Sequence, residues 1–336
     1  MELQLKNIGM IKEANIAIDG LTVIAGENDT GKSTAAKALF FALKVINEVS
    51  SKKSITLGDT QEILNCTKVF NVDILQGKNI NYLEKAEIKI NINGKFIDTK
   101  LALGTSFENI KSQLEDFDFV PDSMFIETPL VWNFTDFFRD IAQVESQMRI
   151  ELDYPYLMKD LNFKLHIKSA SNGLDIKERV TSLMGGEFKK DEMGRYYFDK
   201  QGKRIELINT ATGIKYFGIF QILSQNNYLN KDTVLVLDEP EVHLHPKWQL
   251  EMAKIIVELV KNGVKVLVNS HSPYMIEALE RYGEKSEINM DFYLAEDGMI
   301  DKVEDNNSKT LAQIFNKLSA PYETFNQMDS EILNGG

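Results

Sequence analysis

The chain contains few of the residues that form disulfide frameworks and metal sites. Its 336 residues include four histidines and one cysteine, Cys66. A single thiol cannot form an internal disulfide or a cysteine zinc site, and this usage suits a cytoplasmic protein. No segment approaches the roughly 20 consecutive apolar residues that cross a bilayer, so we expect no membrane association. The N-terminus, with a charge at Glu2, does not have the pattern of a signal peptide.

Positive charge is also scarce. The chain has 38 Lys and Arg against 50 Asp and Glu, a formal net charge of −12. This balance favours solubility and does not indicate nucleic-acid binding, although a local basic patch is compatible with it. There are two candidate patches, and the alternative for both is a set of solvated surface lysines. One is Lys52 and Lys53 with Lys44, and the other is Lys189 and Lys190 with Lys200, Lys203 and Arg204.

The chain does contain the pattern G-x-x-x-x-G-K-S from Gly26 to Ser33. Residues 21–25 before it read as a short apolar strand, and apolar residues recur at helical spacing after it. Backbone N–H groups of such a loop can wrap a polyphosphate at a helix N-terminus. Lys32 would reach the β- and γ-phosphates, and Ser33 would bind Mg²⁺. The sequence therefore predicts a nucleoside triphosphate site.

The order of the expected elements favours an α/β fold. Strands 233–237 and 264–269 alternate with helices, which predicts a parallel core. Hairpins around Asn93 and Gly94, around Gly202, and around Asp297 and Gly298 predict antiparallel strands beside it. We expect further strands at 3–8, 14–18 and 123–126, and helices at 105–118, at 214–223, over most of 132–182 and from 309 onward.

Acidic residues end one predicted buried strand, and a histidine follows the next. Asp238 at the end of strand 233–237 can hold Mg²⁺ through water, and Glu239 is then placed to polarise the attacking water. His271 would donate to the γ-phosphate and sense its loss. Solvated acids and a structural histidine are the alternatives when each motif is considered alone. The phosphate loop in the same chain favours the catalytic interpretation.

A third motif is the helix start around Thr212 and Gly213. Small polar residues and glycine there expose N–H groups that could bind the γ-phosphate of an ATP held by another subunit. A plain helix cap is the alternative. Asp238 lies far downstream of Lys32, whereas compact P-loop enzymes such as GTPases and AAA+ motors place these two motifs much closer together. A long insertion, then a glycine-containing helix start, then Asp-Glu and His, is the ABC order.

With these motifs the chain resembles bacterial ABC-type ATPases of the SMC/RecF/OLD group, more narrowly the stand-alone AAA family ATPases of antiviral and toxin–antitoxin-like loci. The similarity covers about residues 1–50 and 205–330. It implies an α/β ABC-type P-loop ATPase head with a mixed parallel and antiparallel sheet and an inserted helical lobe. We expect one domain, 1–336, made of an N-terminal core part at 1–128, the lobe at 129–205, and a C-terminal core part at 206–336.

The resemblance also implies a head-to-tail homodimer, or a higher homo-oligomer, that holds two ATP molecules with Mg²⁺. Lys32, Glu239 and His271 would be catalytic, and Ser33 and Asp238 would hold the metal. Thr212 and Gly213 would come from the other subunit, and Thr212 departs from the usual serine. The nucleotide-binding residues implied are Gly26, Asn28, Asp29, Thr30, Gly31, Lys32, Ser33, Thr34, Thr212 and Gly213. We assign the Q-loop position to Glu127.

Three other residues have ordinary structural explanations. His243 and His245 have a spacing that metal ligands can show, but no third soft ligand is apparent, so we favour a structural turn with a subunit contact. Trp248 near a helix start is expected to anchor packing.

The first functional hypothesis is an ATP-controlled regulatory ATPase that acts on a separate effector protein, as the resemblance to defence proteins implies. Residues after His271 show no acidic metal cluster of the kind a nuclease needs. Any nuclease or toxin effector should therefore be a separate chain. The second is a RecF-like DNA-maintenance ATPase. The lack of an LSGGQ-like signature disfavours a transporter subunit, and the lack of sustained heptads disfavours an SMC-type arm.

Overall fold

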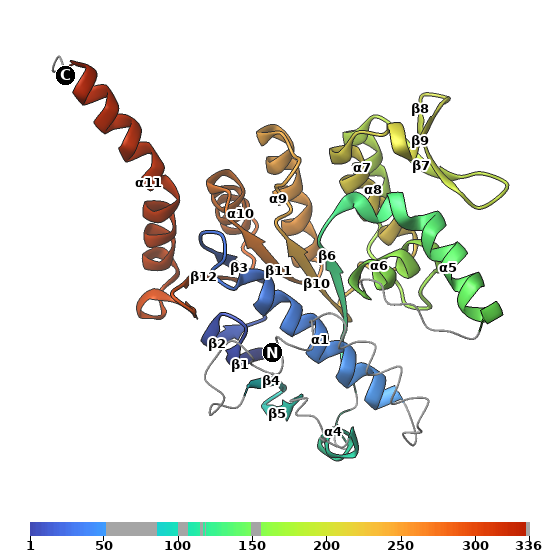
Figure 1. Cartoon of the computed structure of the whole chain (residues 1–336), viewed down its shortest axis with the longest axis horizontal. Coiled ribbons are helices and arrows are strands. Elements are labelled where there is room, and N and C mark those ends of the chain that lie inside the picture. Colours follow the sequence, from blue (N-terminus) through green and yellow to red (C-terminus); the bar gives the residue numbers. More distant parts are fainter. Residues whose placement is uncertain (52–85, 100–106, 115–116, 118, 149–155, 334–336) are drawn as a thin grey trace.

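The computed structural model describes residues 1–51, 86–99, 107–114, 117, 119–148 and 156–333. A ten-stranded sheet forms its centre, in the order β5-β4-β1-β2-β13-β12-β3-β11-β10-β6. Helices cover both faces of this sheet, and the last helix, α11 (Asn307–Leu333), extends away from the body to the C-terminus (Figure 1). The predicted α/β class with a mixed sheet is therefore confirmed.

Five neighbouring strands are parallel, and the functional motifs follow three of them. In sheet order they are β12 (Met290–Glu296), β3 (Leu21–Ala25), β11 (Lys265–Ser270), β10 (Thr233–Asp238) and β6 (Asp122–Ile126). β3 and β10 are buried at every position, as expected for strands with helices on both faces. Because the strands are parallel, their carboxyl ends meet at one edge of the sheet.

The remaining strands of this sheet form the antiparallel hairpins that the turn signals predicted, and one pair among them, β13 with β2, is parallel. β1 (Glu2–Ile8) pairs with β2 (Ile11–Ala17) and with β4 (Glu87–Ile92), which continues through Asn93 and Gly94 into β5 (Lys95–Asp98). β12 turns at Asp297 and Gly298 into β13 (Met299–Asp301), which joins β2.

Two apolar cores lie on opposite faces of the sheet, and alternate residues of one strand point into each. Leu235 and Leu237 of β10 face the core built with α8 (Thr212–Gln225), α9 (Pro246–Lys261) and α10 (Pro273–Lys285). Val234 and Val236 face the core built with α1 (Lys32–Ser51). This division follows from the two-residue period of a strand. Figure 1 shows α1 on one side of the sheet and α9 and α10 on the other.

The segment between β6 and α8 contains helices and a small sheet. It comprises η2 (Pro129–Phe134), α5 (Thr135–Met148), α6 (Tyr156–His166), α7 (Lys177–Met184), β7 (Glu187–Lys190), β8 (Tyr196–Lys200), β9 (Lys203–Glu206) and η3 (Leu207–Asn209). The predicted hairpin around Gly202 is present as β8 and β9, and β7 adds a third strand that we did not predict. α4 (Phe107–Leu114) is the described part of the helix predicted at 105–118. No helix of the described residues is long and apolar enough to cross a membrane.

The prediction that Lys44 belongs to a basic surface patch is wrong, because this lysine is buried. Its Nζ lies 2.6 Å from Asp122 Oδ1 and 3.1 Å from Asp160 Oδ1. Lys164 completes the cluster, 2.7 Å from Asp160 Oδ2 and 3.4 Å from Asp122 Oδ2. The spacing of apolar residues along α1 did not reveal that a lysine lies in the core. Lys52 and Lys53 lie outside the described residues.

This buried charge cluster joins α1, which begins at the phosphate loop, to β6 and to α6 of the inserted segment. Burial opposes ionisation of Asp122, but the two lysines lower its pKa to about 2. Burial likewise opposes the charge on Lys44, yet Asp160 and Asp122 raise its pKa. Asp122 and Lys44 are therefore charged at neutral pH, whereas burial lowers the pKa of Lys164. Removing Lys44 or Asp122 leaves a charge without its partner in this cluster.

We predict that Lys44→Ala lowers the free energy of unfolding by about 3 kcal/mol, since it leaves two partly buried carboxylates with one buried cation. The control is Lys89→Ala, which removes the partly exposed pair with Glu87 and should cost less than about 1 kcal/mol. Urea unfolding of both variants measures the difference. Equal losses would show that the cluster contributes no more than a surface pair.

Candidate functional site

The phosphate loop connects the carboxyl end of β3 to α1. Gly26 has φ 158, and a Cβ there would lie 2.4 Å from the carbonyl oxygen of Ala295. Gly31 has φ 94, in the region that favours glycine. The backbone thus needs glycine at both motif positions, at Gly26 for space and at Gly31 for conformation. This is the arrangement that lets backbone N–H groups approach an anion closely.

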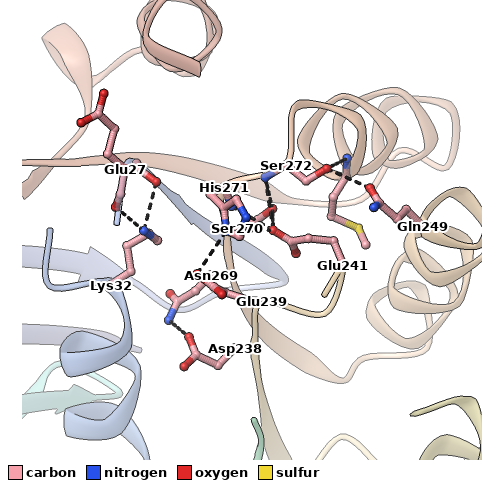
Figure 2. A network of polar contacts seen from close by, with 12 residues as sticks. Glu27, Lys32, Asp238, Glu239, Glu241, Gln249, Asn269, Ser270, His271 and Ser272 are labelled. Carbon is pink, nitrogen blue, oxygen red and sulfur yellow. Dashed lines mark hydrogen bonds and ion pairs between the residues drawn. The ribbon is translucent and has the colours of Figure 1, made fainter. Parts of the chain in front are cut away.

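Lys32 is buried and points back along the loop. Its Nζ donates to the carbonyl oxygens of Gly26 at 3.0 Å and Glu27 at 2.5 Å (Figure 2). Burial lowers the pKa of Lys32, and the charges of Glu239, Asp238, Glu241 and Glu27 oppose this shift. An ammonium group held over the loop by two carbonyl groups is placed to meet an anion bound by the same loop.

Ser33 and Asp238 meet at the edge of the sheet although they are far apart in the sequence. Ser33 Oγ donates to Asp238 Oδ1 at 3.1 Å, and Asn269 Nδ2 donates to the same oxygen at 2.7 Å. Burial raises the pKa of Asp238, and these two hydrogen bonds oppose the shift. One hydroxyl and one carboxylate are hard oxygen donors of the kind that Mg²⁺ prefers.

Among the described residues no group of three or more His, Cys, Asp or Glu could hold a metal ion on its own. Mg²⁺ usually binds through one or two carboxylates together with phosphates and water, so the donors at Ser33 and Asp238 fit Mg²⁺ only as part of a nucleotide complex.

Glu239 and His271 lie beside this pair. Glu239 has φ 50, a left-handed conformation that few residues other than glycine adopt, and its N–H donates to the carbonyl oxygen of Asn269 at 3.0 Å. His271 Nδ1 and Glu239 Oε1 are 3.1 Å apart. Both side chains are partly exposed, 33% for Glu239 and 40% for His271, so they remain accessible from the edge of the sheet.

Glu241 organises the loop that carries His271, a role that the sequence did not reveal. Its Oε1 accepts hydrogen bonds from Ser270 Oγ at 2.7 Å and from the N–H groups of His271 at 2.9 Å and Ser272 at 3.2 Å (Figure 2). Ser272 Oγ in turn donates to Gln249 Oε1 at 2.8 Å. Glu241 is buried, which raises its pKa. In the sequence, this role could have been inferred only from the two serines, Ser270 and Ser272, that flank His271 and can donate to a carboxylate.

A cavity of about 290 Å³ opens next to these residues. Its lining joins Ser33 of α1 and the end of β10 to residues that follow β6: Ser33, Glu127, Thr128, Pro129, Tyr216, Asp238, Glu239, Val242 and His243. Glu127, predicted for the Q-loop position, therefore faces the same space as Asp238 and Glu239. Its carboxylate also lies 3.3 Å from Lys37 Nζ.

Tyr216 was not predicted as a site residue. It comes from α8 and is 2% exposed, and its hydroxyl is buried without a hydrogen-bond partner in the described part of the chain. Burial raises the pKa of Tyr216 well above its usual value, and the charges of Glu241 and Asp238 act in the same direction. A neutral phenol that lines the cavity is a hydrogen-bond donor available to a ligand.

Neither Thr212 nor Gly213 is among the residues that line this cavity, although Tyr216, one turn further along the same helix, is. α8 begins at Thr212, and its N-cap, Ala211, makes no side-chain cap. The N–H groups of the first turn of α8 therefore receive no side-chain acceptor from the N-cap residue. A Cβ on Gly213 would lie 3.3 Å from the side chains of Leu244 and Trp248.

The structure brings most of the predicted site residues together and separates two. Gly26, Asn28, Asp29, Thr30, Gly31, Lys32, Ser33 and Thr34 form the loop and first turn, and Asp238, Glu239 and His271 lie beside them. Thr212 and Gly213 start a different helix. His245 is the N-cap of α9, with Nδ1 accepting from the N–H of Lys247 at 3.3 Å, which agrees with a structural turn. Trp248 packs on Phe217, as an anchor should.

With this geometry in view, comparisons with known proteins show what the chain is similar to. The family model described as an AAA ATPase domain matches residues 134–276, which include Thr212, Asp238, Glu239 and His271 but not the phosphate loop. No curated protein matches the chain.

The chain is also similar to several solved structures. An Smc head bound to the C-winged helix domain of ScpA has a TM-score of 0.51 at 13% identity, over 90% of this chain and 96% of that one. The SMC head domain from Thermotoga maritima has a TM-score of 0.43 at 15% identity, over 90% and 98%. An ATP-binding cassette of an ABC transporter, MJ1267, has 0.40 at 14% identity, over 100% of both chains.

The fold is therefore similar to that of the Smc head in the first of these structures. The family match supports an ATPase of the AAA/ABC/SMC class that uses ATP, in agreement with the phosphate loop and the residues around it.

We predict that Glu241→Ala lowers the free energy of unfolding by about 3 kcal/mol, since one charged acceptor serves three donors. Amide hydrogen exchange at His271 and Ser272 should accelerate, because their N–H groups lose their acceptor. The control, Glu277→Ala, removes an exposed acid paired with Arg281 and should cost less than about 1 kcal/mol. Unchanged exchange at both amides would contradict the organising role.

Proposed function

We propose that the chain binds ATP with Mg²⁺ at the phosphate loop and hydrolyses it. The observation that carries the proposal is the 3.1 Å hydrogen bond between Ser33 and Asp238, because it joins the loop to the strand end that the mechanism needs. In this proposal the loop residues from Gly26 to Thr34 bind the phosphates through their N–H groups, and Lys32 neutralises phosphate charge. Ser33 and Asp238 hold Mg²⁺, which when bound neutralises the charge of the phosphates.

Glu239 and His271 take the roles closest to the reacting atoms. Glu239 accepts a proton from the water that attacks the γ-phosphate, while the bond between that phosphorus and the ADP oxygen breaks. His271 orients the Glu239 carboxylate through the 3.1 Å contact and donates to the γ-phosphate. The buried Glu241 keeps the His271 loop in place. Glu127 faces the same cavity, which supports its assignment to the Q-loop position.

We further propose a head-to-tail homodimer in which each ATP also contacts Thr212 and Gly213 of the other subunit. The support is that these residues start a helix whose N-cap residue makes no side-chain cap and that neither of them lines the cavity of their own subunit. A helix N-terminus stabilises negative charge, so it suits a γ-phosphate. ATP binding then closes the dimer, and hydrolysis opens it.

The same cycle, in our proposal, controls a separate effector protein in antiviral defence. The support for control is that Thr128 and Pro129 line the cavity and continue directly into η2 and the inserted segment, so a change at the cavity reaches that segment. The support for defence is the resemblance of the motifs to ATPases of defence loci.

The remaining candidate basic patch, which a RecF-like role in DNA maintenance would use, is partly neutralised, since two of its five cations are paired with carboxylates. Lys189 pairs with Asp199 at 2.8 Å, and Arg204 pairs with Asp191 at 3.1 Å and Glu206 at 2.7 Å. Cations paired with carboxylates contribute little positive potential for a phosphate backbone. The regulatory function is therefore the better-supported proposal.

We predict that Glu239→Gln lowers kcat for ATP at least ~100-fold and leaves ATP binding intact, since the amide cannot accept the proton. Glutamine has the same shape, so the left-handed backbone at this position is not further strained. Phosphate release measures turnover, and calorimetry with ATP measures binding. Glu277→Gln, the same change on an exposed helix face, should keep wild-type turnover. A Glu239→Gln enzyme as fast as wild type would exclude Glu239 as the base.

We also predict that two inactive variants complement each other. Lys32→Ala disables the loop of its own subunit, and Thr212→Asp repels the γ-phosphate held by the other. In an equimolar mixture about half of the dimers are mixed, and each has one intact site, so turnover should recover to about a quarter of wild type. Each variant alone is the control. A mixture no more active than its components would contradict the shared site.

A further inference from the structure

Five apolar side chains form a continuous row along α5, which we call the α5 stripe: Phe134, Phe137, Ile141, Val144 and Met148. Their intervals alternate strictly between three and four residues, the spacing of heptad positions a and d. Phe134 is the last residue of η2, and Thr135, which follows it, has right-handed helical angles, so the helical path runs through both elements. The row therefore lies on one side of one helix.

The α5 stripe is exposed rather than packed into the body. Phe134 is 39% exposed, Phe137 46%, Val144 38% and Met148 64%, and Ile141 is half-buried. The rings of Phe134 and Phe137 stack edge to face with centroids 6.0 Å apart. By contrast, Phe138 is 8% exposed, so α5 already has a separate inner face. Figure 1 shows α5 at the outer edge of the molecule, away from the central sheet.

An exposed apolar row of this kind is costly in water and marks a contact surface. Heptad spacing selects the shape of the occupant, because side chains at a and d pack between the side chains of a second helix. Binding to a flat surface or to a small ligand would not require apolar residues at alternating intervals of three and four. The occupant that fits is therefore a helix with its own apolar a and d positions.

Charge on α5 indicates which helix fits. The helix carries three carboxylates, Asp136, Asp140 and Glu145, against one guanidinium, Arg139. With Phe134 at position a, Asp140 is at g and Glu145 is at e, the two positions that flank the seam. In a parallel pair of two copies Asp140 would face Glu145 of the other copy, and in an antiparallel pair each acid would face its own counterpart. Like charges at these positions destabilise pairing, so a second copy is a poor occupant.

We propose that the α5 stripe is the docking site for an amphipathic helix of a partner protein, with apolar residues at a and d and Lys or Arg at e and g. The stripe spans two heptads, fewer than the three to four that sustain an independent coiled coil. Docking through this surface alone is therefore weak and reversible. The proposal does not depend on ATP hydrolysis, so it can fail or hold independently of the proposed function.

The test uses a synthetic probe peptide of about three heptads with Leu and Ile at a and d and Lys at e and g. Lysine at both flanks keeps the peptide from pairing with itself. We expect the full chain to bind the labelled peptide with a Kd on the order of 10–100 μM at low salt by fluorescence anisotropy. Binding should weaken as salt rises, since part of the attraction is between exposed charges.

Matched variants and a second peptide test the specificity. Phe137→Asp and Val144→Asp, each on the stripe, should weaken binding at least ~10-fold, whereas Gln143→Asp, the same charge on an exposed position off the stripe, should stay within about threefold. A peptide with Glu at e and g should not bind. Thermal unfolding checks that the variants fold. A similar loss of binding in both stripe variants would show that the loss does not come from a local distortion at one position.

Three results would overturn the proposal. The first is a lysine peptide that does not bind, or that binds the stripe variants as tightly as wild type. The second is equal binding of the lysine and glutamate peptides, which would show non-specific apolar contact. The third is sedimentation of the nucleotide-free chain as a dimer that Val144→Asp dissociates, which would make a second copy the occupant.

Discussion

The parallel register of the neighbouring strands β3, β11 and β10 is the constraint on which the site depends. Asp238 of β10 stands opposite Asn269 of β11, and Ser270 stands opposite Ala25 of β3, just before the phosphate loop. The 2.7 Å bond from Asn269 to Asp238 is possible only in this register. A slip of one residue would turn each of these side chains to the other face of the sheet and separate the loop from the acids.

Two kinds of buried charge support this geometry in different ways. The cluster of Lys44, Lys164, Asp122 and Asp160 is balanced internally, so it holds α1, β6 and α6 together as a permanent structural element. Asp238, by contrast, is buried with neutral hydrogen-bond donors, and burial raises its pKa. A carboxylate in that situation gains most when a cation arrives, which is the electrostatic condition for a metal-dependent nucleotide site.

The chain after β6 connects the site to the surface by a short covalent path. Glu127, Thr128 and Pro129 face the cavity, and η2 then carries the chain to Phe134 and the exposed side of α5. Trp132 within η2 is buried, and its indole N–H donates to the carbonyl oxygen of Lys215 in α8 at 2.8 Å. The helix that begins with Thr212 is thereby linked to the same path, so the cavity, the proposed trans contact and the α5 stripe are in physical contact through packed elements.

The sequence by itself determined the local chemistry: the phosphate loop with its flanking strand and helix, the acids at the end of residues 233–238, and the hairpins at their turns. These signals are short-range, because glycine conformations, capping and apolar periodicity act within a few residues. Only the tertiary structure decided that Lys44 is buried, that Tyr216 lines the cavity, and that Glu241 holds the His271 loop. Each of those depends on which distant element packs beside the residue, and periodicity along one helix or strand carries no information about its neighbour.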